Sequence, residues 1–196
     1  NISREMLQHD HQLKLIAKTL EKKIRTELTK MLNTDREKYE KFFDSFGNSL
    51  KFGIYTDYGM HKDDLIDLLL FKSSNDKKYV TLKEYAERMK SEQPSIYYAS
   101  GETIDRIEML PQVEKVKDMG YEILYLTDYI DEFALKTAMT YENKPFINIC
   151  ADDADFATEE EKDAIKSENE ENTDMFSYMK DSLSEISAVR FTNKLK

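Results

Sequence analysis

The clearest pattern along the chain is a set of three short apolar runs separated by stretches with helical periodicity. The runs are SIYYAS at Ser95–Ser100, YEILYLT at Tyr121–Thr127 and PFINIC at Pro145–Cys150. Each is rich in aromatic and branched side chains and is bounded by turn residues, which is typical of strands buried on both faces of a parallel sheet. The intervening stretches are long enough for crossover helices, so the pattern predicts a βαβαβ unit.

The first part of the chain shows helical periodicity instead. Apolar residues recur three or four positions apart along Gln12–Leu32, Arg36–Tyr55 and Met60–Leu70. The stripe in the second of these stretches is aromatic, and we interpret it as packed core rather than as a cradle for a cofactor. Three amphipathic helices in sequence predict a compact helical coil. Gly47 and Gly53 interrupt the second helix, which indicates close packing or a kink.

Cap and breaker residues place several further elements. Thr81 and Glu84 have the spacing of a capping box, which predicts a helix over Leu82–Lys90. Pro111 divides the first crossover into two helical pieces, because proline is tolerated only at the start of a helix. Gly120 follows the second piece at the position where helices commonly end.

Together these elements predict an α/β fold, with a three-helix coil followed by a small α/β/α sandwich around a mainly parallel βαβαβ sheet. A helix over Thr173–Leu183 and a strand over Ala188–Thr192 are too small to form a core, so we interpret them as the start of a truncated domain. We expect four segments. Residues 1–80 form the catalytic-loop segment and helical coil, 81–150 the sandwich, 151–172 an acidic linker and 173–196 the start of the truncated domain.

The charge is distributed unevenly over the 196 residues. The net charge is −10, yet residues 1–100 hold 18 basic and 16 acidic side chains, whereas residues 151–172 hold 10 acidic side chains and two lysines. This balance gives no general case for nucleic-acid binding. We interpret the acidic block as a solvated linker, with docking of a basic partner as the alternative.

Two features of the sequence bear on the cellular compartment of the protein. The sequence has no apolar run long enough to cross a membrane and a single cysteine, Cys150, which fits a reducing compartment. We therefore expect a cytoplasmic protein that binds no membrane.

Isolated residues give little sign of an autonomous active site. The turn at Ser100–Thr103 favours an ordinary helix cap over an anion site, and His9 and His11 have no evident third metal ligand. Cys150 ends an apolar strand and is interpreted as a buried side chain rather than a nucleophile. Arg4 differs, because a guanidinium in a capped loop beside a helix can grip a phosphate through two hydrogen bonds.

Longer stretches resemble a known family. NISREMLQ at Asn1–Gln8 is similar to the catalytic-loop motif in the middle domain of the heat-shock protein 90 chaperones, of the bacterial HtpG type. The likeness continues, in the order and spacing of the family, through blocks at Tyr39–Gly53, Leu68–Ser74, Thr81–Lys90, Gln93–Glu102, Gly120–Ala134 and Lys144–Ile149.

The resemblance implies a segment of an ATP-dependent chaperone, running from late in the middle domain into the C-terminal domain. In the family, the arginine of the loop reaches the γ-phosphate of ATP, which is bound with Mg by the N-terminal domain. That arginine is Arg4 here, and Gln8 belongs to the same motif. The resemblance thus implies no cofactor or metal held by this segment, and no ATP hydrolysis by it alone.

The partners that the resemblance implies are unfolded or partly folded client proteins, the N-terminal domain, and a second copy in the full-length homodimer. We place client contact at Glu132, Phe133 and Lys136, with an exposed Phe133 as the apolar contact. Packing of Phe133 on the sheet is the alternative. Bacterial relatives often have tryptophan at this position, which implies a weaker contact for phenylalanine.

Two other functions remain open from the residues alone. One is a stand-alone nucleotide or small-molecule enzyme with its site at the carboxyl ends of the strands. The other is a helical adaptor that binds through Gln12–Leu32 and Arg36–Tyr55, which would require the apolar stripes of these helices to be exposed.

Overall fold

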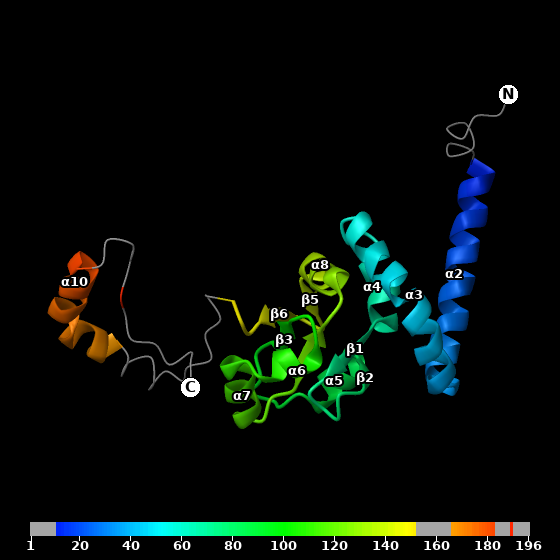
Figure 1. Cartoon of the computed structure of the whole chain (residues 1–196). Coiled ribbons are helices and arrows are strands. Elements are labelled where there is room, and N and C mark those ends of the chain that lie inside the picture. The colour runs from blue at the N-terminus through cyan, green and yellow to red at the C-terminus, as the bar shows by residue number, and fades with distance from the viewer. Residues whose placement is uncertain (1–10, 152–165, 183–188, 190–196) are drawn as a thin grey trace.

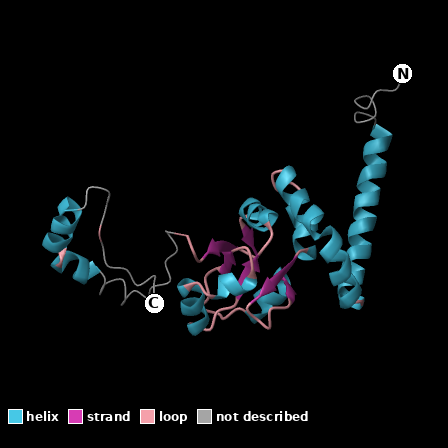
Figure 2. Cartoon of the chain, in the orientation of Figure 1, coloured by secondary structure: helices cyan, strands magenta, loops and turns pink. Residues whose placement is uncertain are grey.

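The computed structural model describes residues 11–151, 166–182 and 189, and these form a mixed α/β structure (Figures 1 and 2). Its centre is a six-stranded sheet in the order β2-β1-β4-β3-β6-β5. The α/β class predicted from the sequence is confirmed. The strand predicted over Ala188–Thr192 lies outside the described residues except for position 189, and the predicted terminal helix is present as α10 (Thr173–Ser182).

The predicted βαβαβ unit forms the middle of the sheet. β3 (Ile96–Ser100) lies between β4 (Ile123–Leu126) and β6 (Lys144–Asn148), and both neighbours run parallel to it. Every residue of β4 is buried, as the unbroken apolar run predicts for a central strand.

The expectation of a mainly parallel sheet is wrong for the sheet as a whole, because three of its five strand pairings are antiparallel. β1 (Leu70–Ser73) pairs with β4 and with β2 (Tyr79–Thr81), and β5 (Thr140–Tyr141) pairs with β6. The added strands have two to four residues, too few to show alternation. Tight turns form the hairpins, with positive φ at the pairs Asp76 and Lys77, and Glu142 and Asn143.

Helices cover both faces of the sheet. α6 (Ile104–Glu108) and α7 (Pro111–Asp118) bury Ile107, Val113 and Val116 on one face, against Tyr97 and Tyr125. On the other face, α5 (Leu82–Arg88) and α8 (Tyr129–Ala138) pack with the alternate strand residues, and α3 (Arg36–Thr56) joins the same core. The predicted capping box of α5 and the turn at Gly120, with φ of 75°, are both present.

The long helix α2 (His11–Thr34) lies at the edge of the molecule beside α3 (Figure 1). Its predicted apolar stripe is buried only near its end, at Leu28, with Met31 and Leu32 partly buried. Ile16, Leu20 and Ile24 are more than half exposed. The described structure therefore leaves most of this stripe open. The helical-adaptor alternative also requires an exposed stripe on α3, and there Tyr39, Phe43 and Ile54 are buried.

The predicted helix over Met60–Leu70 is much shorter than the sequence indicates. α4 covers Lys62–Leu65 and is followed by a 3₁₀ turn, η1 (Ile66–Leu68). The chain then enters β1 at Leu70. Leu68, Leu69 and Leu70 are all buried, so three successive apolar residues point into the core and no solvent-facing side is left for a helix.

Candidate functional site

The two residues predicted to contact a nucleotide cannot be placed. Arg4 and Gln8 lie outside the residues that the structure describes. Their roles stay a prediction, and the site below is built from the predicted client-binding residues on α8.

α8 begins where β4 ends, and its first turn is fixed by its own side chains. The backbone N–H of Asp128 donates to the Asp131 carboxylate at 3.1 Å. Asp131 is buried and forms an ion pair with Lys51 of α3, which is itself 3% exposed. Burial raises the pKa of Asp131 above its ordinary value, and the nearby Lys51 ammonium opposes that shift. The pair fixes α8 against α3.

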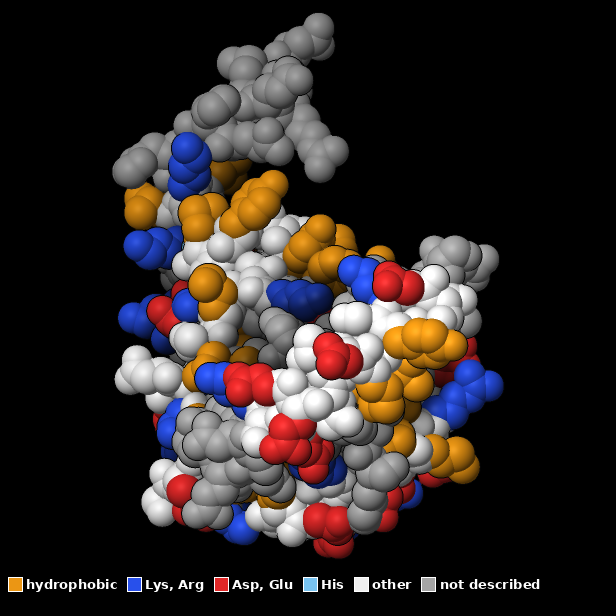
Figure 3. Space-filling model, turned by 90° about the vertical axis from the view of Figure 1, so that its left-hand side faces the viewer, with side chains coloured by type: hydrophobic (Ala, Val, Ile, Leu, Met, Phe, Trp, Pro, Cys, Tyr) orange, Lys and Arg blue, Asp and Glu red, His pale blue; other side chains and the backbone are white. Residues whose placement is uncertain are grey.

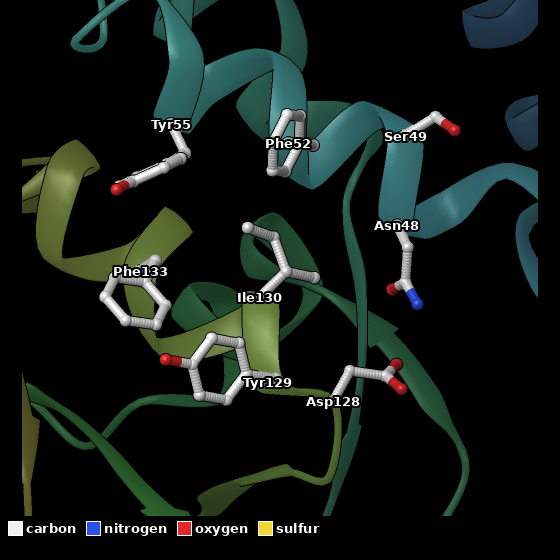
Figure 4. Close-up of a pocket in the computed structure, with 8 residues that line it drawn as sticks. All are labelled: Asn48, Ser49, Phe52, Tyr55, Asp128, Tyr129, Ile130 and Phe133. Carbon is white, nitrogen blue, oxygen red and sulfur yellow. The ribbon is translucent and has the colours of Figure 1, made fainter.

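Phe133 lies on the side of α8 that faces α3. Its ring contacts Tyr55 of α3 at 5.4 Å, edge to face, and Tyr129 of its own helix at 5.0 Å. The side chain is 36% exposed. Its ring contacts are thus with neighbouring aromatic residues in the opening between the two helices (Figure 4). These contacts favour the prediction that Phe133 is exposed over the alternative that it packs on the sheet.

An open cleft of about 770 Å³ runs between the two helices. Phe52 and Tyr55 project from α3, and Tyr129 and Phe133 project from α8 on the opposite side (Figure 4). Its full lining is Asn48, Ser49, Phe52, Tyr55, Asp128, Tyr129, Ile130 and Phe133. The volume is in the range of ligand sites, and the lining is predominantly apolar with a few polar groups.

Glu132 and Lys136 do not line the cleft. The Glu132 carboxylate accepts hydrogen bonds from Tyr98 at 3.4 Å and Asn148 at 3.3 Å, and it pairs with Lys136 at 2.9 Å. Burial raises the pKa of Glu132, but these hydrogen bonds and the Lys136 charge outweigh it and hold the pKa below its ordinary value. Of the three predicted client-binding residues, Phe133 alone is in the cleft, while Glu132 holds α8 to the carboxyl ends of β3 and β6.

Other candidate residues have structural roles. The Thr103 hydroxyl accepts from the Arg106 N–H at 3.3 Å, so the Ser100–Thr103 turn is an ordinary cap of α6. Burial raises the pKa of the Cys150 thiol, which disfavours the reactive thiolate. In the part of the chain that the structure describes, no three metal-ligating side chains gather, and no helix is long and apolar enough to cross a membrane.

Sequence reasoning missed three of the four cleft aromatics, namely Phe52, Tyr55 and Tyr129. A signal for two of them was available. The core-facing stripe of α3 runs through Tyr39, Phe43 and Ile54, so Phe52 and Tyr55 fall on a different side of the same helix. Large apolar residues off the core stripe mark a possible contact surface.

The fold and this site define a mixed α/β module that presents an aromatic cleft. All 196 residues match the sequence profile of the family described as Hsp90 protein, and the chain therefore belongs to that family. It is 54% identical to chaperone protein HtpG of Oceanobacillus iheyensis and 53% identical to that of Bacillus subtilis. Each match covers 100% of this chain and about a third of the relative, 31% and 32%.

A solved structure supports the same relationship. The middle domain of a heat shock protein of Plasmodium falciparum aligns with a TM-score of 0.66 and 30% sequence identity, covering 71% of this chain and 58% of that one. The resemblance inferred from the sequence blocks is confirmed at the level of the family.

Proposed function

We propose that this chain is a segment of an ATP-dependent molecular chaperone that couples ATP binding in an N-terminal domain to the binding and folding of client proteins. The observation that carries the proposal is the aromatic cleft that holds Phe133, in a chain of the Hsp90 family. Partly exposed aromatic rings in a wide, open cleft suit weak contact with many unfolded segments, because such segments share apolar side chains rather than a common shape.

Client contact is tested in the longer protein that we propose contains this segment. Phe133→Ala should weaken suppression of the aggregation of an unfolded test protein, because it removes the ring that joins the two sides of the cleft. Tyr58→Ala is the control, since Tyr58 is 90% exposed and does not line the cleft. Unchanged suppression by Phe133→Ala would refute the client site.

The nucleotide role is proposed for Arg4, with Gln8 in the same loop. A guanidinium near the γ-phosphate would stabilise the charge of the transferred phosphoryl group, while the ATP and its Mg²⁺ are held by the N-terminal domain. In the longer protein, Arg4→Ala should lower ATP turnover at least about tenfold, or ~1.4 kcal/mol in the activation barrier. The chain alone should not hydrolyse ATP, and measurable turnover by it would contradict the proposal.

The wider setting follows from the same proposal. We expect the longer protein to be a cytoplasmic homodimer whose partners are unfolded or partly folded proteins, not nucleic acids or membranes. The stand-alone enzyme is the weaker candidate, because Lys136 and Asn148 both bind the Glu132 carboxylate at the carboxyl ends of the strands, where its substrate would lie. The adaptor alternative keeps one observation in its favour, the exposed stripe of α2.

A further inference from the structure

We propose that the cleft between α3 and α8 binds short apolar segments that carry an arginine, within partly unfolded proteins. The inference rests on the proposed client-binding function and adds the side-chain chemistry that the cleft selects. It follows from two properties of the lining residues, the order of their aromatic rings and the sign of their charge.

The aromatic residues form one continuous series. Ring centroids are 6.0 Å apart for Phe52 and Tyr55, 5.4 Å for Tyr55 and Phe133, and 5.0 Å for Phe133 and Tyr129. The series therefore passes from α3 across to α8. All four rings are partly exposed, from 36% for Phe133 to 86% for Tyr129. They offer apolar surface to a leucine or phenylalanine, and the faces of their rings attract cations.

The cleft has an apolar end and a polar end. Figure 4 shows Tyr55 and Phe133 together at one end, and Asn48 and Asp128 together at the other, with Tyr129 between them on α8. A bound segment can therefore place an apolar side chain against Tyr55 and Phe133 and a polar group beside Asp128.

The charge at the polar end is negative. Among the eight residues that line the cleft, Asp128 is the charged one, and its side chain is 50% exposed. Beneath it, the Lys51 ammonium lies 3.5 Å from Asp128 but is paired with the buried Asp131. Asp128 is thus the charge that the cleft lining itself presents, so the polar end offers a carboxylate to a cation and repels an anion.

Arginine fits this end better than lysine. Its planar guanidinium can bind a carboxylate with two parallel hydrogen bonds and can lie flat on an aromatic ring, whereas an ammonium does neither. Asp128, the N-cap of α8, and the neighbouring Tyr129 supply both partners on consecutive residues. Because the cleft has few other polar groups, this contact would make it bind an apolar segment with an arginine more tightly than one without.

Three fluorescently labelled peptides test the inference against the whole chain by anisotropy. Each has a Leu-Phe pair followed by arginine, glutamine or glutamate, in an otherwise identical Gly-Ser frame. At low salt, the arginine peptide should bind at least about fivefold more tightly than the glutamine peptide, and the glutamate peptide should bind most weakly. About 0.5 M salt should reduce these differences, because Asp128 is solvent-exposed.

Two variants and a control locate the effect. Asp128→Asn should remove the preference for arginine while the glutamine peptide binds as before, and asparagine preserves the start of α8 because it is an equally good N-cap. Tyr129→Ala should weaken all three peptides, and Tyr58→Ala, at an equally exposed tyrosine outside the cleft, should weaken none. Far-ultraviolet circular dichroism checks that each variant is folded.

Several results would overturn the inference. The three peptides could bind with equal affinity or not at all, or Tyr58→Ala could lower peptide affinity as much as Tyr129→Ala does. Self-association of the chain that the peptides compete with would also overturn it, since a second copy would then occupy the cleft. Failure of this selectivity is distinct from failure of the client site. If the peptides bind equally but Phe133→Ala still weakens suppression of aggregation, the proposed function stands and the preference for arginine does not.

Discussion

The ammonium of Lys51 and the carboxylate of Asp131 form an ion pair inside the molecule, where their side chains are 4% and 3% exposed. The same ammonium lies 5.3 Å from the ring centre of Phe43 and 5.4 Å from that of Phe71. The pair joins α3 to the first turn of α8, next to the aromatic cleft. It therefore fixes the two helices that carry the cleft residues.

Replacing Lys51 should be among the most costly changes in this protein. Lys51→Met leaves the buried Asp131 carboxylate without its cation, so we expect a loss of about 3–5 kcal/mol in the free energy of unfolding, measured with urea. Lys41→Met is the matched control, because Lys41 is 73% exposed and pairs with Glu37 of its own helix, and it should leave the stability nearly unchanged. Similar losses for the two variants would contradict this account.

Glu108 should make the free energy of unfolding depend on pH in the acidic range. Lys117 and Lys77, and then Tyr125, donate hydrogen bonds that hold the pKa of Glu108 at about 2, below its ordinary 4.5. Because the folded-state pKa is lowered, the stabilisation is complete above about pH 4.5 and is lost as the pH falls toward 2.

The test is Glu108→Gln, followed by urea unfolding at several pH values. With a side chain that is 24% exposed, Glu108 should contribute about 1–3 kcal/mol at pH 7, and the variant and the parent should converge near pH 2. Glu102→Gln, at a side chain that is 76% exposed, is the control and should show little pH-dependent difference from the parent. A constant gap between parent and Glu108→Gln at every pH would refute the linkage.

Gly47 is required by packing rather than by backbone conformation. A Cβ atom added at this position would lie 2.6–2.8 Å from three ring atoms of the buried Phe43. Gly47→Ala should therefore destabilise the protein by about 1–3 kcal/mol, although alanine normally favours a helix over glycine. At Gly53 the nearest atom to an added Cβ is a Leu65 methyl at 3.1 Å, so Gly53→Ala should be nearly neutral or stabilising in the same thermal or urea unfolding measurement.

The Tyr85 hydroxyl should contribute more to the free energy of unfolding than a group with one typical hydrogen bond. It donates to the Glu122 carbonyl at 2.6 Å and accepts from the buried Gln93 amide at 2.9 Å and the Tyr97 N–H at 3.1 Å. Tyr85→Phe removes these three hydrogen bonds from the interior, so we expect a loss of about 1–3 kcal/mol in unfolding free energy. Tyr178→Phe, at a side chain that is 74% exposed, serves as the control.

Elements whose signals are local could be predicted from the sequence. The runs that became β3 and β4 are buried along almost their whole length, as predicted, and the Thr81–Glu84 capping box needs only residues three positions apart. The run that became β6 forms the predicted strand, but its residues are partly buried or exposed, so the prediction that it is buried on both faces is wrong. The family could also be recognised from the sequence, because the order and spacing of its blocks are read along the chain without knowledge of the fold.

Which faces of the helices are covered depends on long-range packing and could not be predicted from the sequence. The periodicity of α2 and of α3 looks alike, yet Ile16, Leu20 and Ile24 are exposed while Tyr39 and Phe43 are buried. The cleft exists because α3 and α8, some eighty positions apart along the chain, are brought together by Lys51 and Asp131. A pattern of apolar residues shows that a face can be buried, but the partner that buries it comes from elsewhere in the chain.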